Sequence, residues 1–184
     1  AQLAKSWNFS EASFGMAALN SYYATPSVAD EHGFALADAP WPQIFDPFRN
    51  AVAGKKVAVI GHFPFAPKAL NQAADFYMLE RSLNEGDYPD SAAEYILPEC
   101  DYVFITGSAF VNKTAPRLLE LSRESFNVVL GPSTPLAPVL VEDYGVSQVT
   151  GMVPTSPLAM FEGLSGTDAG TTMFDWGHRV ELSA

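Results

Sequence analysis

The segment Lys56-Val-Ala-Val-Ile60 is followed directly by Gly61. The same pattern, a short apolar run that ends at a glycine, recurs further along the chain. Runs that are nearly continuous in apolar and β-branched residues are typical of strands covered on both faces. The segments expected to form such strands are 56–60, 75–79, 101–106, 127–130 and 146–150. Between them, segments with helical patterns lie at 67–74, 90–97, 112–122 and 136–144. This alternation predicts an α/β fold, a Rossmann-like parallel sheet with helices on both faces.

The first 50 residues follow a different pattern. A helical periodicity begins at Ser10, a residue suited to cap a helix, and continues to Tyr23, before a proline-rich stretch that indicates a surface linker. One amphipathic helix cannot form a domain alone. We therefore expect residues 1–50 to be the remnant of an N-terminal lobe with its linker, and residues 51–184 to form the Rossmann-like domain. The alternation in residues 171–182 predicts a hairpin or a terminal pair of strands.

Composition excludes several classes of protein. Of the 184 residues 48% are hydrophobic, which argues against a disordered chain, and the net charge of −11 argues against nucleic acid or an anionic membrane as partner. No apolar run approaches the roughly 20 residues that cross a bilayer, and the start of the chain shows no signal-peptide pattern. The single cysteine, Cys100, excludes an internal disulfide framework and predicts a cytoplasmic protein.

Ligands of open α/β sheets bind beyond the carboxyl ends of the strands, so the turns there are the candidate site. The first turn, Gly61-His-Phe-Pro64, lacks the G-x-G-x-x-G pattern, and two prolines, Pro64 and Pro67, remove backbone donors. This argues against ordinary NAD binding. Glu80, about 20 residues beyond Gly61, stands where dinucleotide folds place a carboxylate that binds ribose. Alternatively, it is a strand-end carboxylate in water or paired with Arg81.

An acidic loop, residues 84–90, is expected to lie near Glu80. Crowded carboxylates repel one another unless a cation or a shared proton relieves them, and His62 is the one histidine at the predicted strand ends. The predicted metal ligands are therefore His62, Glu80 and Asp87. Imidazole and carboxylate ligands together suit a divalent transition metal such as Ni, Co or Zn better than Ca. The alternative is a solvated loop beside a structural histidine, and no CxxC or HExxH zinc pattern is present.

The loops after the third and fourth strands offer hydroxyl, amide and ammonium groups next to predicted helices. Backbone donors at a helix N-terminus would suit an anionic part of a ligand. Alternatively, Asn112 and Ser133 cap the helices that follow them. Together with Glu80, the candidate cofactor-binding residues are Gly107, Ser108, Asn112, Lys113, Thr114, Gly131, Ser133 and Thr134.

Several motifs, in the same order along nearly the whole chain, resemble one bacterial and archaeal family of unknown function labelled "putative heavy-metal chelation". They include Gly61-His-Phe-Pro64, Glu85-Gly-Asp-Tyr-Pro89 and Gly131-Pro-Ser-Thr-Pro-Leu-Ala-Pro138. The resemblance implies an enolase-N-terminal-like α+β lobe before the Rossmann-like domain, with a site where the two meet. It also implies that a β-rich part of that lobe precedes residues 5–23 and that this chain begins after it.

Three functions stay open at this point. The first is a cleft that binds a heavy-metal ion or a small molecule that chelates one. The second is an enzyme with a nucleotide-type cofactor, NAD or S-adenosylmethionine, in which Glu80 binds a ribose and the Gly107 and Gly131 loops surround the rest. The third is a scaffold subunit whose apolar surface patches pair two copies in a homo-oligomer. The sequence favours the first and leaves open whether any reaction is catalysed.

Overall fold

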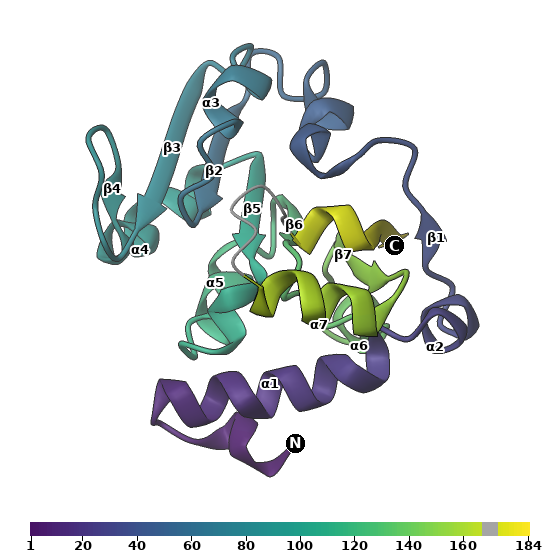
Figure 1. Cartoon of the computed structure of the whole chain (residues 1–184). Helices are drawn as coiled ribbons and strands as arrows, with labels where there is room; N and C mark the ends of the chain where they lie inside the picture. Colours follow the sequence, from purple (N-terminus) through teal and green to yellow (C-terminus); the bar gives the residue numbers. More distant parts are fainter. Residues whose placement is uncertain (167–172) are drawn as a thin grey trace.

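The computed structural model describes residues 1–166 and 173–184, and these residues form a single eight-stranded sheet with helices around it (Figure 1). The strand order is β1-β8-β7-β6-β5-β2-β3-β4. The strands are β1 (Ala35–Leu36), β2 (Lys56–Ile60), β3 (Asp75–Glu80), β4 (Tyr88–Pro89), β5 (Tyr102–Thr106), β6 (Phe126–Leu130), β7 (Gln148–Pro154) and β8 (Gly177–Ser183).

The six strands from β4 to β7 are parallel, which confirms the predicted Rossmann-like sheet. Counted along the chain, these strands have the order 3-2-1-4-5-6 of doubly wound folds. The chain moves outward from β2 to β3 and β4 and then returns to β5 on the other side of β2. The order of the strands therefore reverses between β2 and β5, and this is where such folds bind their ligands.

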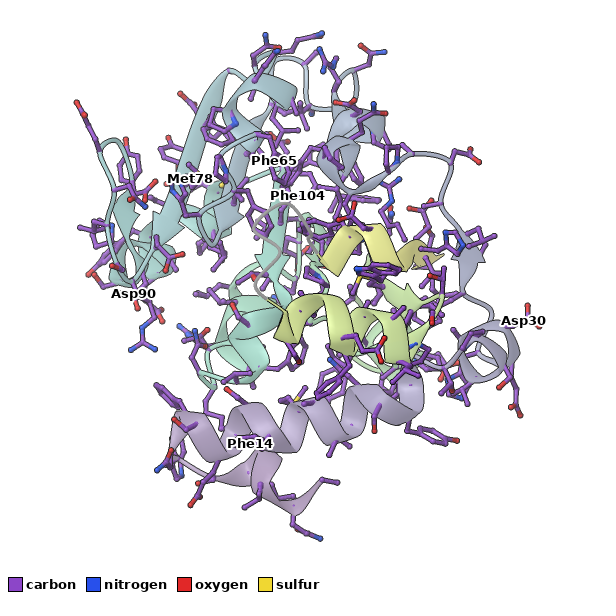
Figure 2. The ribbon with its side chains drawn as sticks, viewed as in Figure 1. Phe14, Asp30, Phe65, Met78, Asp90 and Phe104 are labelled. Carbon is purple, nitrogen blue, oxygen red and sulfur yellow. The ribbon has the colours of Figure 1, made fainter. Side chains whose placement is uncertain are left out.

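Successive residues of the central strands supply two separate cores, because side chains in a strand point alternately to opposite faces. Ala58 and Ile105 belong to one core, whereas Val59 and Phe104 belong to the other. Figure 2 shows Phe104 in the middle of the molecule, and its side chain is fully buried. Both faces of the sheet are therefore covered, as the nearly continuous apolar runs predict.

The helices predicted between the strands are shorter in the structure than their sequence patterns indicate. The structure has α1 (Phe9–Tyr23), α2 (Pro26–Glu31), α3 (Ala66–Ala69), α4 (Ala93–Ile96), α5 (Ala115–Leu121), α6 (Val139–Glu142) and α7 (Pro157–Ser165). Helix α6 begins only after Pro138, since this proline interrupts the predicted helical segment 136–144. Helix α3 ends early, and the chain after it returns to the sheet, where the amide of Ala74 donates to the carbonyl of Lys55.

The proline-rich segment before β2 is part of the second core and does not lie on the surface as expected. It forms two 3₁₀ turns, η2 (Trp41–Gln43) and η3 (Asp46–Phe48). Trp41, Phe45 and Phe48 are buried, and the rings of Phe45 and Phe48 both contact that of Phe104. These aromatic contacts fix residues 41–48 against one face of the sheet.

Helix α1 lies along the lower side of the molecule in Figure 1, at the N-terminal end of the chain. Its N-cap is Asn8 and not Ser10, since the Asn8 side chain accepts hydrogen bonds from the amides of Ser10 and Glu11. The helix buries only Ala12 and Gly15. Phe14, labelled in Figure 2, is 72% exposed. The last residue of the helix, Tyr23, packs against the first core.

Within the predicted terminal strand pair, Met173–Trp176 form a 3₁₀ turn, η7, and only Gly177–Ser183 form a strand, β8, so the described part of this segment is not the expected hairpin or pair of strands. Strand β8 instead pairs antiparallel with β7 and β1. Thr171 and Thr172, the first residues of the predicted alternation, lie outside the described residues. No helix within residues 1–166 and 173–184 has the length and apolar character needed to cross a membrane.

Candidate functional site

A cavity of about 390 Å³ opens at the carboxyl ends of β2, β3 and β5, where the strand order reverses. Its volume lies within the range of roughly 300–1,000 Å³ that is usual for small-molecule sites. Five of the residues predicted for the site line it, namely Glu80, Ser108, Asn112, Lys113 and Thr114.

Glu80 ends β3, and its carboxylate holds the neighbouring turns together. One oxygen accepts the backbone N–H of His62 at 2.9 Å and the other accepts that of Arg81 at 2.7 Å. The Arg81 side chain pairs instead with Asp90, at 3.3 Å between Nε and Oδ2. The carboxylate thus stands where a ribose would bind in a dinucleotide fold, and it is already hydrogen-bonded to the protein backbone.

The turn after β2 is closed and short. Gly61 has a φ of 104°, and a Cβ there would lie 3.1 Å from Thr106 at the end of β5. In residues 61–75, all of which the structure describes, the crossover to β3 contains only the four-residue helix α3. Such a short helix offers little of the N-terminal dipole that holds a pyrophosphate in dinucleotide folds.

His62, which follows β2, and Asp87, which precedes β4, contact each other, and neither of them lines this cavity. Nδ1 of His62 lies 3.2 and 3.1 Å from the two carboxylate oxygens of Asp87, whose side chain has no exposed surface. Asp87 also accepts the backbone N–H of Asn84 at 2.9 Å and its side-chain amide at 3.3 Å. The Asn84 backbone bond above all, with help from His62, lowers the pKa of Asp87. The His62 ring keeps 32% of its surface exposed.

These contacts do not assemble a site for a bare metal ion. Among the described residues, no three His, Cys, Asp or Glu side chains are grouped closely enough to hold one. Glu80 and Asp87 both point their oxygens at N–H donors of the protein. Cys100 is buried at the other end of the sheet, where desolvation raises the pKa of its thiol to about 11. The assignment of His62, Glu80 and Asp87 as metal ligands therefore stays a prediction.

The loop after β5 carries the densest set of polar groups. The hydroxyls of Thr106 and Ser108 lie 3.1 Å apart, and Oδ1 of Asn112 accepts from both the amide and the hydroxyl of Thr114. Lys113 has a φ of 68° and is the one non-glycine residue with positive φ in the described part of the chain. Its Nζ donates to the carbonyl of Ala4 in the N-terminal segment. Strained backbone of this kind is frequent at functional sites.

The loop after β6 packs against the end of β5 and does not line the first cavity. Gly107 packs so closely on Thr134 that a Cβ at Gly107 would lie 2.5 Å from the Thr134 amide nitrogen. Gly107, Gly131 and Thr134 line neither this cavity nor a second one of about 610 Å³ beneath α1. Ser133 lines that second cavity, and its carbonyl accepts a hydrogen bond of 2.8 Å from the side chain of Asn20.

Ion pairs from the helices complete the wall of the first cavity. Arg117, which is not among the residues predicted for the site, binds Glu94 at 2.8 Å and Glu120 at 2.7 Å. Its spacing, one helical turn after Lys113, is the only sequence signal that could have suggested it. The charged residues of the lining are the carboxylates Glu80, Asp90 and Glu94 and the cations Arg81, Lys113 and Arg117. The lining is therefore balanced in charge, although the chain carries a net charge of −11.

Comparisons with known proteins place the chain among relatives of unknown function. The sequence model of a family described as "Putative heavy-metal chelation" matches residues 43–180. An uncharacterized protein of Methanocaldococcus jannaschii is 29% identical over 101 residues, which are 52% of this chain and 39% of that protein. The chain thus spans about two fifths of the length of this curated relative.

Two solved structures of proteins with unknown function from the DUF364 family share the fold. The Desulfitobacterium hafniense protein is 44% identical with a TM-score of 0.87, and the match covers 100% of this chain and 72% of that one. The Pyrococcus horikoshii protein is 22% identical with a TM-score of 0.78, and the match covers 98% and 72%. At 22% identity the second likeness concerns the fold alone.

Proposed function

This chain belongs to the DUF364 family, described as "Putative heavy-metal chelation", and we propose that its cavity at the carboxyl ends of β2, β3 and β5 binds a small molecule that chelates a metal ion. The observation that carries the proposal is a cavity of ligand size at the reversal of strand order whose carboxylates already have partners in the protein. Glu80 accepts two backbone N–H groups, and Asp90 and Glu94 pair with arginines. A metal ion bound in this cavity would therefore need most of its ligands from a chelating molecule.

The polar groups of the lining suit such a molecule. The hydroxyl of Ser108 and the amide of Asn112 can hydrogen-bond to its oxygen atoms, while Leu79, Ala109 and Leu118 provide apolar walls. Because the ion pairs of the lining balance one another, a ligand of small net charge can enter without a large electrostatic penalty. A metal complex in which carboxylates neutralise the ion meets this condition.

The second candidate is an enzyme with a nucleotide-type cofactor, NAD or S-adenosylmethionine. The strand order and the position of Glu80 at the end of β3 favour it. Against it, a ribose would compete with the backbone amides of His62 and Arg81 for the Glu80 oxygens, and α3 is too short to hold a pyrophosphate.

A thermal-shift experiment on protein treated with EDTA and then dialysed separates the two. The probes are Ni²⁺, Co²⁺ and Zn²⁺, each alone and as the nitrilotriacetate complex, together with NAD, NADP and S-adenosylmethionine. A ligand at 100 times its Kd stabilises the native state by about 2.7 kcal/mol, which raises the Tm of a domain of this size by roughly 5–10 °C. We expect the complexes to produce a larger rise than the ions alone.

Two tryptophan variants locate the effect. Ser91→Trp fills the cavity that Ser91 lines, whereas Ser82→Trp places the same side chain on exposed surface outside it. The rise should disappear in the first variant and persist in the second. An equal rise in both would contradict the proposal, as would the absence of any rise with the complexes, and a rise with a nucleotide alone would make the second candidate the function.

A further inference from the structure

We propose that the second cavity, about 610 Å³ beneath α1, is a separate binding site for an uncharged aromatic molecule that carries a lactam or secondary amide group. The two cavities are neighbours, because Ser108 and Asn112 line both. The proposal is nevertheless independent of the metal chelate, and it would stand if the first cavity held none.

Helix α1 covers this cavity without filling it. The residues of the helix that line it recur at the spacing of one helix face, namely Ser13, Met16, Ala17, Asn20 and Ser21. Two long-range hydrogen bonds hold the N-terminal segment in place, from Nζ of Lys113 to the carbonyl of Ala4 and from the side chain of Asn20 to the carbonyl of Ser133. Protein interiors are closely packed, so a space of this size left under a helix is typical of a ligand site.

The lining of the second cavity favours a ligand without charge. None of the lining residues that the structure describes is Asp, Glu, Lys, Arg or His. The first cavity, in contrast, is lined by three carboxylates and three cations. An ion that enters an uncharged lining loses its hydration and gains no partner of opposite charge, so the second cavity should select uncharged molecules.

The side chain of Asn20 sets the first hydrogen bond that a ligand must make. Its Nδ2 donates to the carbonyl of Ser133 at 2.8 Å, and this fixes the orientation of the amide because a carbonyl only accepts. Oδ1 of Asn20 is thereby left buried, with no hydrogen-bond partner among the described residues. Buried polar atoms are nearly always paired, so we expect the ligand to supply an N–H donor to this oxygen.

Asn112 offers the complementary group. Its Oδ1 already accepts two hydrogen bonds from Thr114, at 3.1 and 2.6 Å, so its NH₂ group remains as the donor for a ligand. A molecule that donates to Asn20 and accepts from Asn112 needs both an N–H and a C=O group, and a lactam or secondary amide has both. Met16 and Met152 add thioether sulfur atoms to the lining, and such sulfur atoms pack favourably on aromatic rings.

The test uses two probes, isoindolinone, which is an uncharged aromatic lactam, and N-methylisoindolinone, which lacks the N–H group. Chemical-shift titrations of ¹⁵N-labelled protein give the Kd values, which for molecules of this size are on the order of millimolar. We expect isoindolinone to bind about tenfold more tightly than its methyl derivative, because the derivative leaves Oδ1 of Asn20 unpaired. Asn20→Leu should remove this preference.

Matched tryptophan variants locate the site. Ala17 and Ala18 are both exposed residues of α1, but only Ala17 lines the cavity. Ala17→Trp should abolish the binding of isoindolinone, whereas Ala18→Trp should leave its Kd unchanged. Ser91→Trp, which fills the first cavity, should also leave the Kd unchanged.

Each outcome supports or overturns a part of the proposal. Absence of shifts in the signals of α1, or binding that survives in Ala17→Trp, would overturn the site. Equal Kd values for the two probes in the wild type, or a preference that persists in Asn20→Leu, would overturn the role of Asn20 and the class of ligand derived from it. Loss of binding in Ser91→Trp alone would place the probe in the first cavity. None of these results bears on the metal chelate, which has its own probes.

Discussion

Replacing Gly107 by alanine should destabilise the fold, because this glycine is where the end of β5 meets the loop after β6. The new Cβ would lie 2.5 Å from the amide nitrogen, 2.8 Å from Cα and 2.8 Å from Oγ1 of Thr134. Two of these atoms belong to the backbone and cannot rotate away. Thr134 is itself 2% exposed, so the loop has little room to retreat.

The magnitude follows from two opposing effects. Overpacking of this kind typically lowers the free energy of unfolding by about 1–3 kcal/mol. Because backbone atoms of Thr134 must move, we expect a cost for Gly107→Ala near the upper end of that range, at about 3 kcal/mol. The loss of glycine's freedom in the unfolded chain offsets up to about 1 kcal/mol. The net expectation is a loss of about 2 kcal/mol in the free energy of unfolding, or roughly 4–8 °C in Tm.

Urea denaturation at neutral pH measures this loss, and Gly54→Ala is its matched control. Gly54 has a φ of +71° and nothing within 4 Å of a built Cβ, so alanine there meets only the backbone penalty of about 1 kcal/mol. Gly107→Ala should therefore be the less stable variant. If its stability lies within about 0.5 kcal/mol of the wild type, or above that of Gly54→Ala, the described contact between Gly107 and Thr134 is wrong.

Three further changes test other parts of the structure. In Gly15→Ala the new Cβ would lie 1.9 Å from the amide nitrogen of Ala4, so residues 2–5 should leave α1 and exchange their amide protons faster. Alanine also favours the helix by about 1 kcal/mol relative to glycine, so the free energy of unfolding should change little. Unchanged amide exchange in residues 2–5 would contradict the packing of Gly15 on Ala4. Burial raises the pKa of Cys100 to about 11, so only about 0.1% of this thiol is thiolate in the folded protein at pH 8. The folded protein should therefore react with iodoacetamide at least about 100-fold more slowly than the protein unfolded in urea. Equal rates in the two states would refute the burial of Cys100. The backbone N–H of Lys56, at 2.9 Å, lowers the pKa of Asp101 in the folded state, so its stabilisation is present above about pH 4 and lost as the pH falls through the folded pKa. The wild type should thus exceed Asp101→Asn in urea midpoint at pH 7 and approach it as the pH falls through the lowered pKa of folded Asp101, and a constant difference would argue against this bond.

The fold was predictable because its strands are buried on both faces. Residues 56–60 and 102–106 combine β-branched and aromatic side chains in short runs, and burial of both faces requires such runs whatever the surrounding helices do. The 3₁₀ turns that carry Trp41 and Phe48 have no comparable periodicity, so their place in the core could not be read from the sequence. Their prolines indicate a loop but do not indicate its depth.

The position of the cavity was predictable, and the contacts of the side chains that line it were not. Parallel strands bring their carboxyl ends to one edge, so Glu80 and Asn112 were expected near each other before any loop was known. Which partner a carboxylate takes depends on loop backbone angles that no pattern encodes. Glu80 therefore binds backbone amides while Arg81 pairs with Asp90, and the enclosure of Asp87 depends on the turn at Asn84.

The proposed function depends on a metal chelate that occupies the cavity at the ends of β2, β3 and β5. The most direct measurement is a titration of ¹⁵N-labelled protein with Cu²⁺-nitrilotriacetate, in which the paramagnetic ion broadens the amide signals nearest to it. If the chelate occupies the cavity, the signals of residues 61–62, 80–81 and 106–113 should disappear first, and excess Zn²⁺-nitrilotriacetate should restore them. Early loss around His178 in β8, or uniform broadening along the chain, would rule out the proposed site.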